Sequence, residues 1–383
     1  MNREQETLFA LVKKSQFGSG LELNWDCIDI EALYNEASIQ SVLGIVASEI
    51  PDDLINSKWQ EVIYLRKADY IRYCHAEDEL KIVLDNAAIP FVILKGNAAA
   101  ISYDNPSLRT MGDIDFLVPQ DLYDSARTYL IDNGYIINHE SELYTRHIGL
   151  IKDGISFELH HHFSHDDNDI EGYLVDGFNS IEIVSVDGHE FPMLPKLANG
   201  LVLLDHLRNH LKSAVGLRQI IDWMMYVYRN LDDRFWNDEF KAVAEEKGMD
   251  TLAITVTRMC QLYLGLPESI SWCQSADVET CKELMECVLS SGNFGRKNGK
   301  GYSVEKVSTS MKREGTFRWL QHAGEHNWKA YHKHHWLKPF CWLYQIFRYA
   351  KQGIKTGRNT KQLKSDFDRS KERYELLKKL NIS

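Results

Sequence analysis

The sequence predicts an α+β fold, in which a small mixed β-sheet core lies between N-terminal and C-terminal helical regions. Apolar residues recur every three to four positions before residue 85 and again after residue 195, which is typical of helices. Between these regions, short apolar and β-branched runs end at glycine, proline or Asp-Gly, which is typical of strands and turns. We therefore expect a helical region over 1–85, an α/β core over 86–194, a helical domain over 195–350 and a basic helical tail over 351–383.

The expected strands of the core are the runs 89–96, 113–119, 142–154, 155–163, 180–188 and 189–194. Short helices are expected between them, at 97–104 and 120–135. Each of the last two pairs of strands is joined by an Asp-Gly dipeptide, at Asp153-Gly154 and Asp187-Gly188. Asp-Gly favours the positive backbone angles of a tight two-residue turn, so both pairs are predicted to be antiparallel hairpins.

The composition indicates an ordinary globular protein of a reducing compartment. Hydrophobic residues make up 44% of the 383 positions and charged residues 26%. The seven cysteines include no Cys-x-x-Cys pair, so we expect free thiols and a cytoplasmic location. The first residues are too polar for a signal peptide, and no apolar stretch reaches the roughly 18 residues of a membrane span.

The charge is unevenly distributed along the chain. The net charge is −11, yet residues 311–383 hold 17 Lys or Arg against 6 Asp or Glu. The acidic remainder disfavours wrapping by nucleic acid, whereas the basic end could meet an anionic partner or simply be a solvated helical surface. The aromatic and basic segment 336–355 could lie on a membrane surface, but we favour packing against the helical lobe.

Two aspartates interrupt the apolar run RTMGDIDFL at residues 109–117. Side chains alternate along a strand, so Asp113 and Asp115 share one face. On the later strand Glu158 and His160 share a face for the same reason. If these strands are neighbours, three carboxylates converge on one surface, where they repel each other unless a cation lies between them. Hard oxygen ligands of this kind suit Mg²⁺ or Mn²⁺.

A strand-to-helix turn upstream is suited to binding phosphate. The sequence LKG ends at Gly96 and a short helix follows, so backbone N–H groups can approach a phosphate closely. Lys95 could contact phosphate or form an ion pair, and the Asn97 amide can donate to phosphate. Two divalent ions on the carboxylates could then activate an acceptor oxygen and stabilise a leaving pyrophosphate.

Together, LKGNAAAISYDNPSLRTMGDIDFLV and SFELHHHF resemble the DNA polymerase β-like nucleotidyltransferase superfamily, and more narrowly a bacterial family of uncharacterised nucleotidyltransferases. The matching positions are Leu94, Lys95, Gly96, Arg109, Met111, Gly112, Asp113, Asp115, Glu158 and His160. Farther along, DHLRNHLKSAVGLRQIIDW resembles the family's helical segment. The resemblance implies a polymerase β-like core. It also implies transfer of a nucleoside monophosphate from a nucleoside triphosphate (NTP), such as ATP, to an acceptor, with release of pyrophosphate.

The resemblance also implies roles for single residues. The metal ligands and catalytic residues would be Asp113, Asp115 and Glu158, with Glu158 also a candidate base. The triphosphate would be held by Lys95, Gly96, Asn97, Arg109 and Gly112. The superfamily usually carries Gly-Ser where this chain has Gly-Asn. Arg109 could instead hold its loop through an internal carboxylate, which we favour slightly. The acceptor is unidentified, and a small molecule or a protein is favoured over nucleic acid.

Two other functions stay open, namely a catalytically degenerate nucleotide-binding regulator or scaffold, and an RNA-directed nucleotidyltransferase that uses the basic end. The histidine run His160–His162 with His165 could bind zinc, but alternation along a strand separates its members, so His160 is better explained as a residue that orients Glu158. The remaining candidates are His206 and His210 in hydrogen-bonded or substrate-facing roles, Arg218 and Asp222 as an ion pair, and 295–303 as a loop without P-loop spacing.

Overall fold

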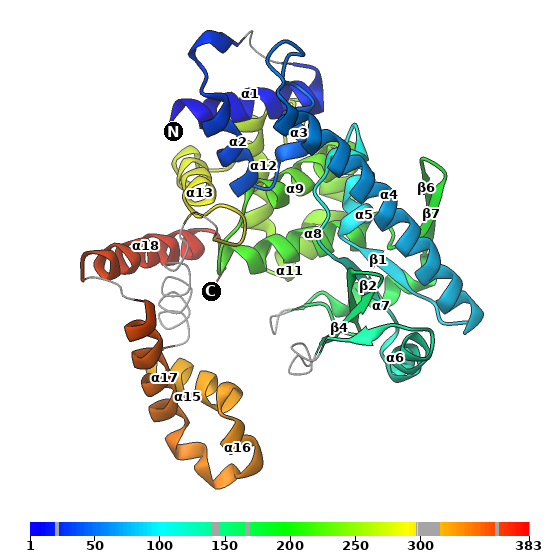
Figure 1. The fold of residues 1–383 in the computed structure, drawn as a ribbon, viewed down its shortest axis with the longest axis vertical. Helices are drawn as coiled ribbons and strands as arrows, with labels where there is room; N and C mark the ends of the chain where they lie inside the picture. Colours follow the sequence, from blue (N-terminus) through cyan, green and yellow to red (C-terminus); the bar gives the residue numbers. More distant parts are fainter. Residues whose placement is uncertain are drawn as a thin grey trace.

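The computed structural model describes residues 1–19, 23–138, 146–164, 169–295, 297, 315–356 and 360–382. It has an α+β fold, in which a seven-stranded mixed sheet is surrounded by helices from both ends of the chain (Figure 1). The fold class predicted from the sequence is therefore confirmed. All seven cysteines are free, as expected. Among the described residues, no helix combines the length and the apolar character needed to cross a membrane.

The sheet has the strand order β3-β4-β5-β2-β1-β7-β6. Its strands are β1 Val92–Leu94, β2 Ile114–Leu117, β3 Ile136–Ile137, β4 His147–Lys152, β5 Ile155–His160, β6 Glu182–Val186 and β7 His189–Met193. Strand β2 lies at the centre, antiparallel to β1 and parallel to β5. The short edge strand β3 is absent from the sequence prediction, and residues 142–145 of one predicted strand lie outside the described residues.

Both predicted hairpins are confirmed. Strands β4 and β5 pair antiparallel, and so do β6 and β7. The turn residues Asp153, Gly154, Asp187 and Gly188 have φ angles of 49°, 73°, 52° and 82°. Positive φ at both central residues is the requirement of a type I′ turn, whose twist matches that of the flanking strands. The register of β5, which carries Glu158, is therefore set by a two-residue turn.

Helices cover both faces of the sheet. The N-terminal helices are α1 Arg3–Phe17, α2 Ile30–Ile39, α3 Leu43–Ala47 and α4 Ser57–Asn86, and those of the core are α5 Gly96–Ala100, α6 Tyr123–Asp132 and α7 Glu171–Gly177. The later helices are α8 Lys196–Leu211, α9 Leu217–Asn230, α10 Asp233–Phe235, α11 Lys241–Glu246, α12 Asp250–Leu264 and α13 Val278–Ser291. The last ones are α15 Thr316–Asn327, α16 Lys329–Lys333, α17 Cys341–Thr356 and α18 Thr360–Lys379.

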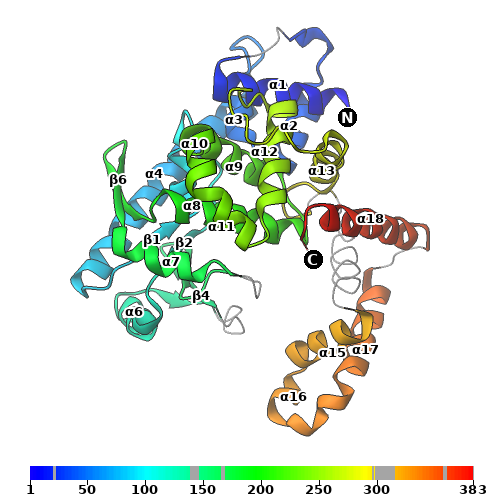
Figure 2. The same cartoon turned by 180° about the vertical axis from the view of Figure 1, so that it is seen from behind.

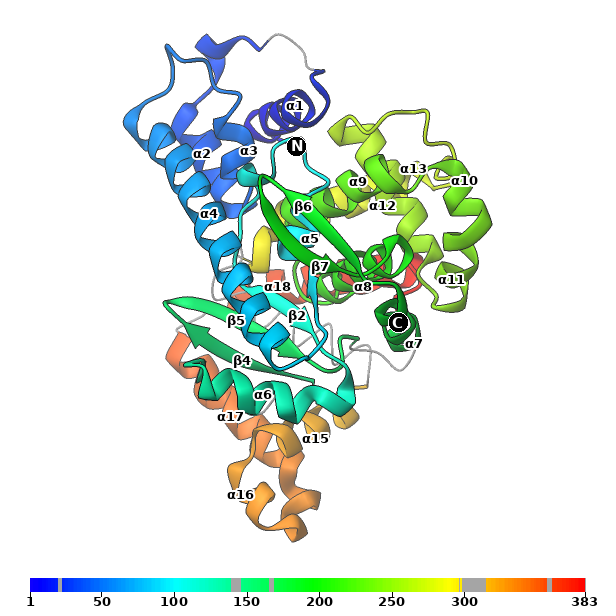
Figure 3. The ribbon, with the colours of Figure 1, turned by 90° about the vertical axis from the view of Figure 1, so that its right-hand side faces the viewer.

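The alternation of side chains along the central strands divides the interior into two apolar cores. Ile93 and Phe116 pack on one face with α4 and α6. Val92, Leu94 and Leu117 point to the other face and join the core of the later helices. Figure 3 shows α4 crossing the sheet, with α8 on the side away from it. The two aspartates of the sequence motif lie on the α8 side, because Asp115 alternates with Phe116.

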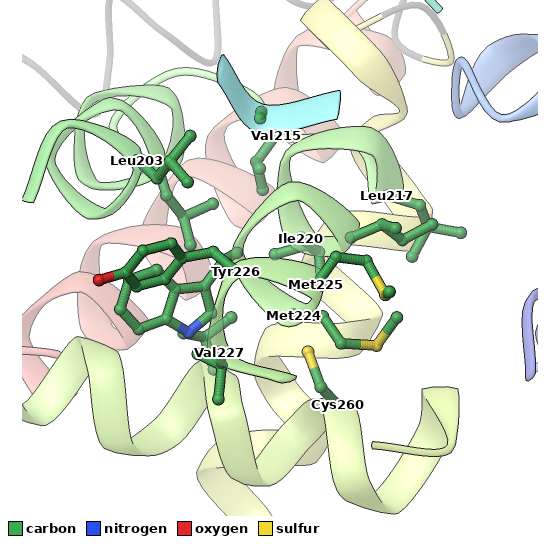
Figure 4. Packing of buried hydrophobic residues seen from close by; sticks show 14 of the residues in the cluster. Leu203, Val215, Leu217, Ile220, Met224, Met225, Tyr226, Val227 and Cys260 are labelled. Carbon is green, nitrogen blue, oxygen red and sulfur yellow. The ribbon is translucent and has the colours of Figure 1, made fainter. Parts of the chain in front are cut away.

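Helix α9 is the centre of the larger core. Residues 219–227 are all buried, so the helix is enclosed on every side. Figure 4 shows Met224 and Met225 of α9 close to Cys260 of α12, while Leu203 of α8 lies on another side of the cluster. A sharp bend at Ser41, where φ is 59°, separates α2 from α3. The bend lets Gln40 Oε1 accept the Leu217 N–H at 3.1 Å, which ties the N-terminal region to the start of α9.

The C-terminal elements are arranged in two ways. Helix α18 returns to α13, where Leu376 and Leu380 are buried in the larger core. Helices α15 to α17 instead project away from the rest of the molecule (Figures 1 and 2). There Trp328 stacks on Tyr344 with ring centroids 5.0 Å apart, while the Trp336 side chain is 71% exposed. Segment 336–355 thus packs partly on α15, and its membrane contact and the domain boundaries stay predictions.

Gly44→Ala is expected to destabilise the fold. A Cβ at this position in α3 would lie 2.3 Å from the carbonyl oxygen of Leu108, a backbone atom that cannot rotate away. Overpacking of this kind costs about 1–3 kcal/mol. The midpoint of thermal unfolding, followed by circular dichroism, should therefore fall by about 2 °C or more.

Gly172→Ala is the matched control, because a Cβ on this helical glycine would meet no heavy atom within 4 Å. This variant should leave the midpoint unchanged or raise it slightly, since alanine favours helix more than glycine does. Equal midpoints for the two variants would contradict the close approach of α3 to the segment that precedes β2.

Candidate active site

Strand pairing brings the three predicted carboxylates together. In the parallel pair of β2 and β5, Asp115 lies directly beside Glu158. Asp113 stands two positions before Asp115 and therefore shares its face. Carboxylate oxygens of Asp113, Asp115 and Glu158 all lie within 4.8 Å of one another. The Glu158 side chain is 32% exposed, so the cluster is open to solvent on one side.

The Asp115 carboxylate is bound by side chains from both neighbouring strands. It is only 3% exposed. Lys95 Nζ, from the end of β1, lies 2.7 Å from Asp115 Oδ1, and His160 Nε2, from β5, lies 3.1 Å from the same oxygen. Burial alone would raise the pKa of Asp115, but the Lys95 charge and the His160 contact hold it well below its usual range. Asp115 therefore stays ionised.

The protein compensates the negative charge of Asp113 less well than that of Asp115. The neighbouring Asp115 carboxylate, and secondly burial, raise the pKa of Asp113 to about 6. Lys95 lowers the pKa of Asp113, and the Arg218 guanidinium of α9 lowers it by a smaller amount. A carboxylate in this situation gains from an added cation. The three acidic side chains thus have the chemistry of a divalent-metal site.

The predicted phosphate turn is formed by Lys95 and Gly96. Their φ angles are 52° and 36°, so both adopt backbone conformations that are rare outside glycine. The turn folds the Lys95 ammonium back over β2, where burial would lower its pKa but Asp115, Asp113 and Glu158 raise it. Lys95 therefore forms a buried ion pair. A Cβ on Gly96 would meet no heavy atom within 4 Å, so the backbone there is accessible.

The Asn97 side chain, for which a contact with phosphate is predicted, is engaged inside the protein. Asn97 is 2% exposed and donates through Nδ2 to Glu77 Oε2 at 3.0 Å. The same Glu77 oxygen lies 2.9 Å from His189 Nε2. The amide thus belongs to a buried polar network that joins α5 to α4 and β7. Only the Asn97 backbone N–H is left as a candidate for contact with phosphate.

The Arg109 side chain, for which a contact with the triphosphate is predicted, is also engaged inside the protein. Arg109 donates from Nε and Nη2 to both oxygens of Asp222, at 2.7 and 2.8 Å, and both side chains are buried. The Tyr103 hydroxyl donates to Asp222 Oδ1 at 2.7 Å. The alternative in which Arg109 holds its loop through an internal carboxylate is therefore confirmed. Asp222 raises the pKa of Arg109, although burial lowers it.

Arg218 lies close to its predicted partner Asp222. Burial would raise the pKa of that carboxyl, but Arg109 lowers it, and the Arg218 charge helps to lower it by a smaller amount. Asp222 is also bound on both oxygens by Arg109, and Arg218 Nη1 donates to the Thr110 carbonyl at 3.2 Å. A Cβ on Gly112 would lie 3.8 Å from Arg218 Nη1. Arg218 therefore brings a cation next to the Gly-Asp motif. The proposed role of Gly112 in triphosphate binding stays a prediction.

The histidines are dispersed, as strand alternation predicts. His160 lies 3.4 Å from Glu158 Oε2, in the predicted place beside that carboxylate. His161 packs on the Tyr123 ring, and His162 lies 3.7 Å from Glu171 Oε1. His165 and most of 295–303 fall outside the described residues.

Another pair of histidines lies on α8. His206 and His210 approach each other at 2.8 Å between their Nε2 atoms, as the hydrogen-bonded role requires. Burial, and secondly His210, hold the pKa of His206 well below its usual range, so His206 stays neutral.

The fold and this set of carboxylates are those that the sequence resemblance implies for a nucleotidyltransferase. A family model described as "Uncharacterised nucleotidyltransferase" matches residues 26–265, and the chain belongs to this family. The comparison with curated proteins gave no match. The chain is also similar to the crystal structure of an antigenic nucleotidyltransferase-like protein from Paracoccidioides brasiliensis, with 10% identity and a TM-score of 0.30. That similarity covers 52% of this chain and 95% of the other.

Asp222→Asn is expected to destabilise the protein strongly. The substitution leaves the buried Arg109 guanidinium without its ionised partner, and breaking a buried pair in this way costs about 3–5 kcal/mol. Asp104→Asn is the matched control, because Asp104 pairs with Arg229 at 3.4 Å on the surface. An exposed pair contributes about 0–1 kcal/mol.

Urea unfolding followed by tryptophan fluorescence measures both changes in the free energy of unfolding. A loss below about 1 kcal/mol for Asp222→Asn, equal to that of the control, would contradict the structural role assigned to the buried pair.

Proposed function

We propose that this protein is a divalent-metal-dependent nucleotidyltransferase, which moves a nucleoside monophosphate from an NTP to an acceptor and releases pyrophosphate. One observation carries the proposal. Asp113, Asp115 and Glu158 place carboxylate oxygens within 4.8 Å of one another, in a chain that belongs to a nucleotidyltransferase family. A surface chosen only for stability would not gather three carboxylates, because they repel each other.

The carboxylate cluster fits Mg²⁺ or Mn²⁺. These ions prefer oxygen ligands, and Asp113, Asp115 and Glu158 offer them from one face of the sheet. The raised pKa of Asp113 supports the same assignment, because it reflects negative charge that a bound cation would offset. When bound, the metal supplies electrostatic stabilisation of the charge that develops on the triphosphate during transfer.

The chain's own residues can bind and orient the triphosphate. Gly96 leaves its backbone accessible at the turn, and the neighbouring Lys95 ammonium contacts Asp115. Backbone N–H groups of Gly96 and Asn97 are therefore the proposed phosphate donors, with the Lys95 charge nearby. Arg218 brings a further cation close to Asp113. These positions would hold the α-phosphate near the carboxylates without using the Asn97 side chain.

Glu158 is the proposed base for the acceptor. Asp115 is bound by Lys95 and His160, so it is poorly placed to take a proton. Glu158 is partly exposed and is oriented by His160. In the proposed step the acceptor oxygen bonds to the α-phosphorus, the bond from that phosphorus to the pyrophosphate oxygen breaks, and the acceptor proton moves to Glu158.

The acceptor is proposed to be a small molecule or a protein. The site lies in the acidic part of the chain, whereas the basic residues gather after position 311. A polyanion such as RNA is favoured near a positive surface and disfavoured near a negative one. The experiment below also tests the RNA-directed alternative and the degenerate regulator, since each predicts a different fate of the label.

Label transfer tests the proposed function. The purified protein is incubated with Mg²⁺ or Mn²⁺, each α-labelled NTP, and the small-molecule, RNA or protein fraction of a lysate. We expect label in one of the three fractions. Asp113→Asn should lower the rate at least about 100-fold, the usual scale for removing one electrostatic catalytic group. Glu158→Gln should act in the same direction. Asp132→Asn, an exposed aspartate at the end of α6, makes the same charge change and should retain full activity.

The fraction that takes up the label identifies the acceptor class, and label in RNA would favour the RNA-directed alternative. Metal-dependent NTP binding without any transfer would favour the regulator. Equal transfer by wild type and by a folded Asp113→Asn variant would contradict the proposed site.

A further inference from the structure

The β4–β5 hairpin places two histidines and Glu158 on one face. In its register His147 pairs with His160, and Gly149 pairs with Glu158. His147 and His160 therefore face each other across the hairpin, and Glu158 stands two positions from His160 on the same side. Gly149 has no side chain, so the β4 residue that pairs with Glu158 places no side chain between it and the histidines.

The Nε2 atoms of both rings lie near the Glu158 carboxylate. His147 Nε2 lies 3.8 Å from Glu158 Oε1, and His160 Nε2 lies 3.4 Å from Glu158 Oε2. His160 Nε2 also lies 3.1 Å from Asp115 Oδ1, a contact that a bound ion would replace. The two ring centroids are 4.8 Å apart. Ligand atoms that share one ion at about 2.0–2.2 Å lie roughly 3–4 Å from one another. The observed spacing is therefore close to that of a metal site before the ion binds.

We propose that His147, Glu158 and His160 form a second metal site, which takes a transition ion such as Mn²⁺ or Zn²⁺ in preference to Mg²⁺. Imidazole nitrogen is a good ligand for transition ions, whereas Mg²⁺ keeps oxygen ligands and water. The site shares Glu158 with the proposed oxygen-only site. It differs from that site in its two nitrogen ligands, His147 of β4 and His160 of β5.

The surroundings support this assignment. The His160 side chain is 4% exposed and packs beside the Phe163 ring, with centroids 5.8 Å apart, so its orientation is fixed. The partly exposed Glu158 leaves a path for an ion from solvent. The α8 pair His206 and His210 is a weaker candidate. Among the described residues, neither group of side chains with metal-ligand spacing includes it.

Pulsed electron paramagnetic resonance of Mn²⁺ bound to the full chain tests the site without any need for activity. Wild type should show coupling to the nitrogens of directly bound imidazoles, and His147→Gln should weaken it, because only His160 then supplies a nitrogen ligand. His75→Gln removes an exposed histidine of α4 as the matched control and should retain the coupling. Zn²⁺ should displace Mn²⁺ and abolish the nitrogen coupling at concentrations at least about tenfold lower than Mg²⁺ needs for the same effect.

Several outcomes would overturn the proposal. They are oxygen-only coordination in wild type, nitrogen coupling that is undiminished in a folded His147→Gln variant, and coupling weakened in His210→Gln but not in His147→Gln. Asp113→Asn separates this inference from the proposed function. Because Asp113 is outside the histidine site, that variant should lose nucleotide transfer and keep the nitrogen coupling. Failure of transfer in wild type would not remove the coupling.

Discussion

The buried carboxylate of Asp115 is the constraint on which the rest of the site depends. An ionised carboxylate on a central strand is strongly unfavourable unless cations and hydrogen bonds compensate it. Here Lys95 and His160 reach the same oxygen from the strands on either side. Three adjacent strands therefore meet at one charged group. The unusual backbone of Lys95, with φ of 52°, is the local conformation that brings its ammonium to Asp115.

The later helices complete the site, so the core is not independent of them. Helix α9 contributes Asp222, which holds Arg109 and with it the loop that leads into β2. The same helix places Arg218 beside Gly112. The family match over 26–265 covers the sheet and these helices together, in agreement with a site that needs both. An account limited to the sheet would miss the ion pair that positions the Gly-Asp motif.

The fold class, the hairpins and the carboxylate cluster were predictable because their signals are local. Alternation along a strand places Asp113 beside Asp115, and an Asp-Gly turn sets the register of β5. The same turn pairs Lys152 with Ile155, and continuing this register along both strands pairs His147 with His160. The histidine cluster could therefore have been predicted from the sequence, but it was not.

The partners of Asn97, Arg109 and Arg218 were not predictable in this way. The bond from Asn97 to Glu77 spans 20 positions, and the pair of Arg109 with Asp222 spans 113. Helical spacing suggested Arg218 as a partner of Asp222, but it gave no sign of the contact that Arg109 makes with both Asp222 oxygens. Partner choice among buried charges depends on the packed structure, because burial decides which cation can reach a carboxylate.

A crystal structure of the protein with Mn²⁺ and a non-hydrolysable NTP analogue would show directly whether the three carboxylates bind the metal. We expect anomalous density for a metal between Asp113, Asp115 and Glu158, with the triphosphate at Gly96 and its α-phosphate beside the metal. The backbone of Lys95 and the pair of Arg109 with Asp222 should be unchanged. A nucleotide bound elsewhere, with no metal among these carboxylates, would rule out the proposed active site.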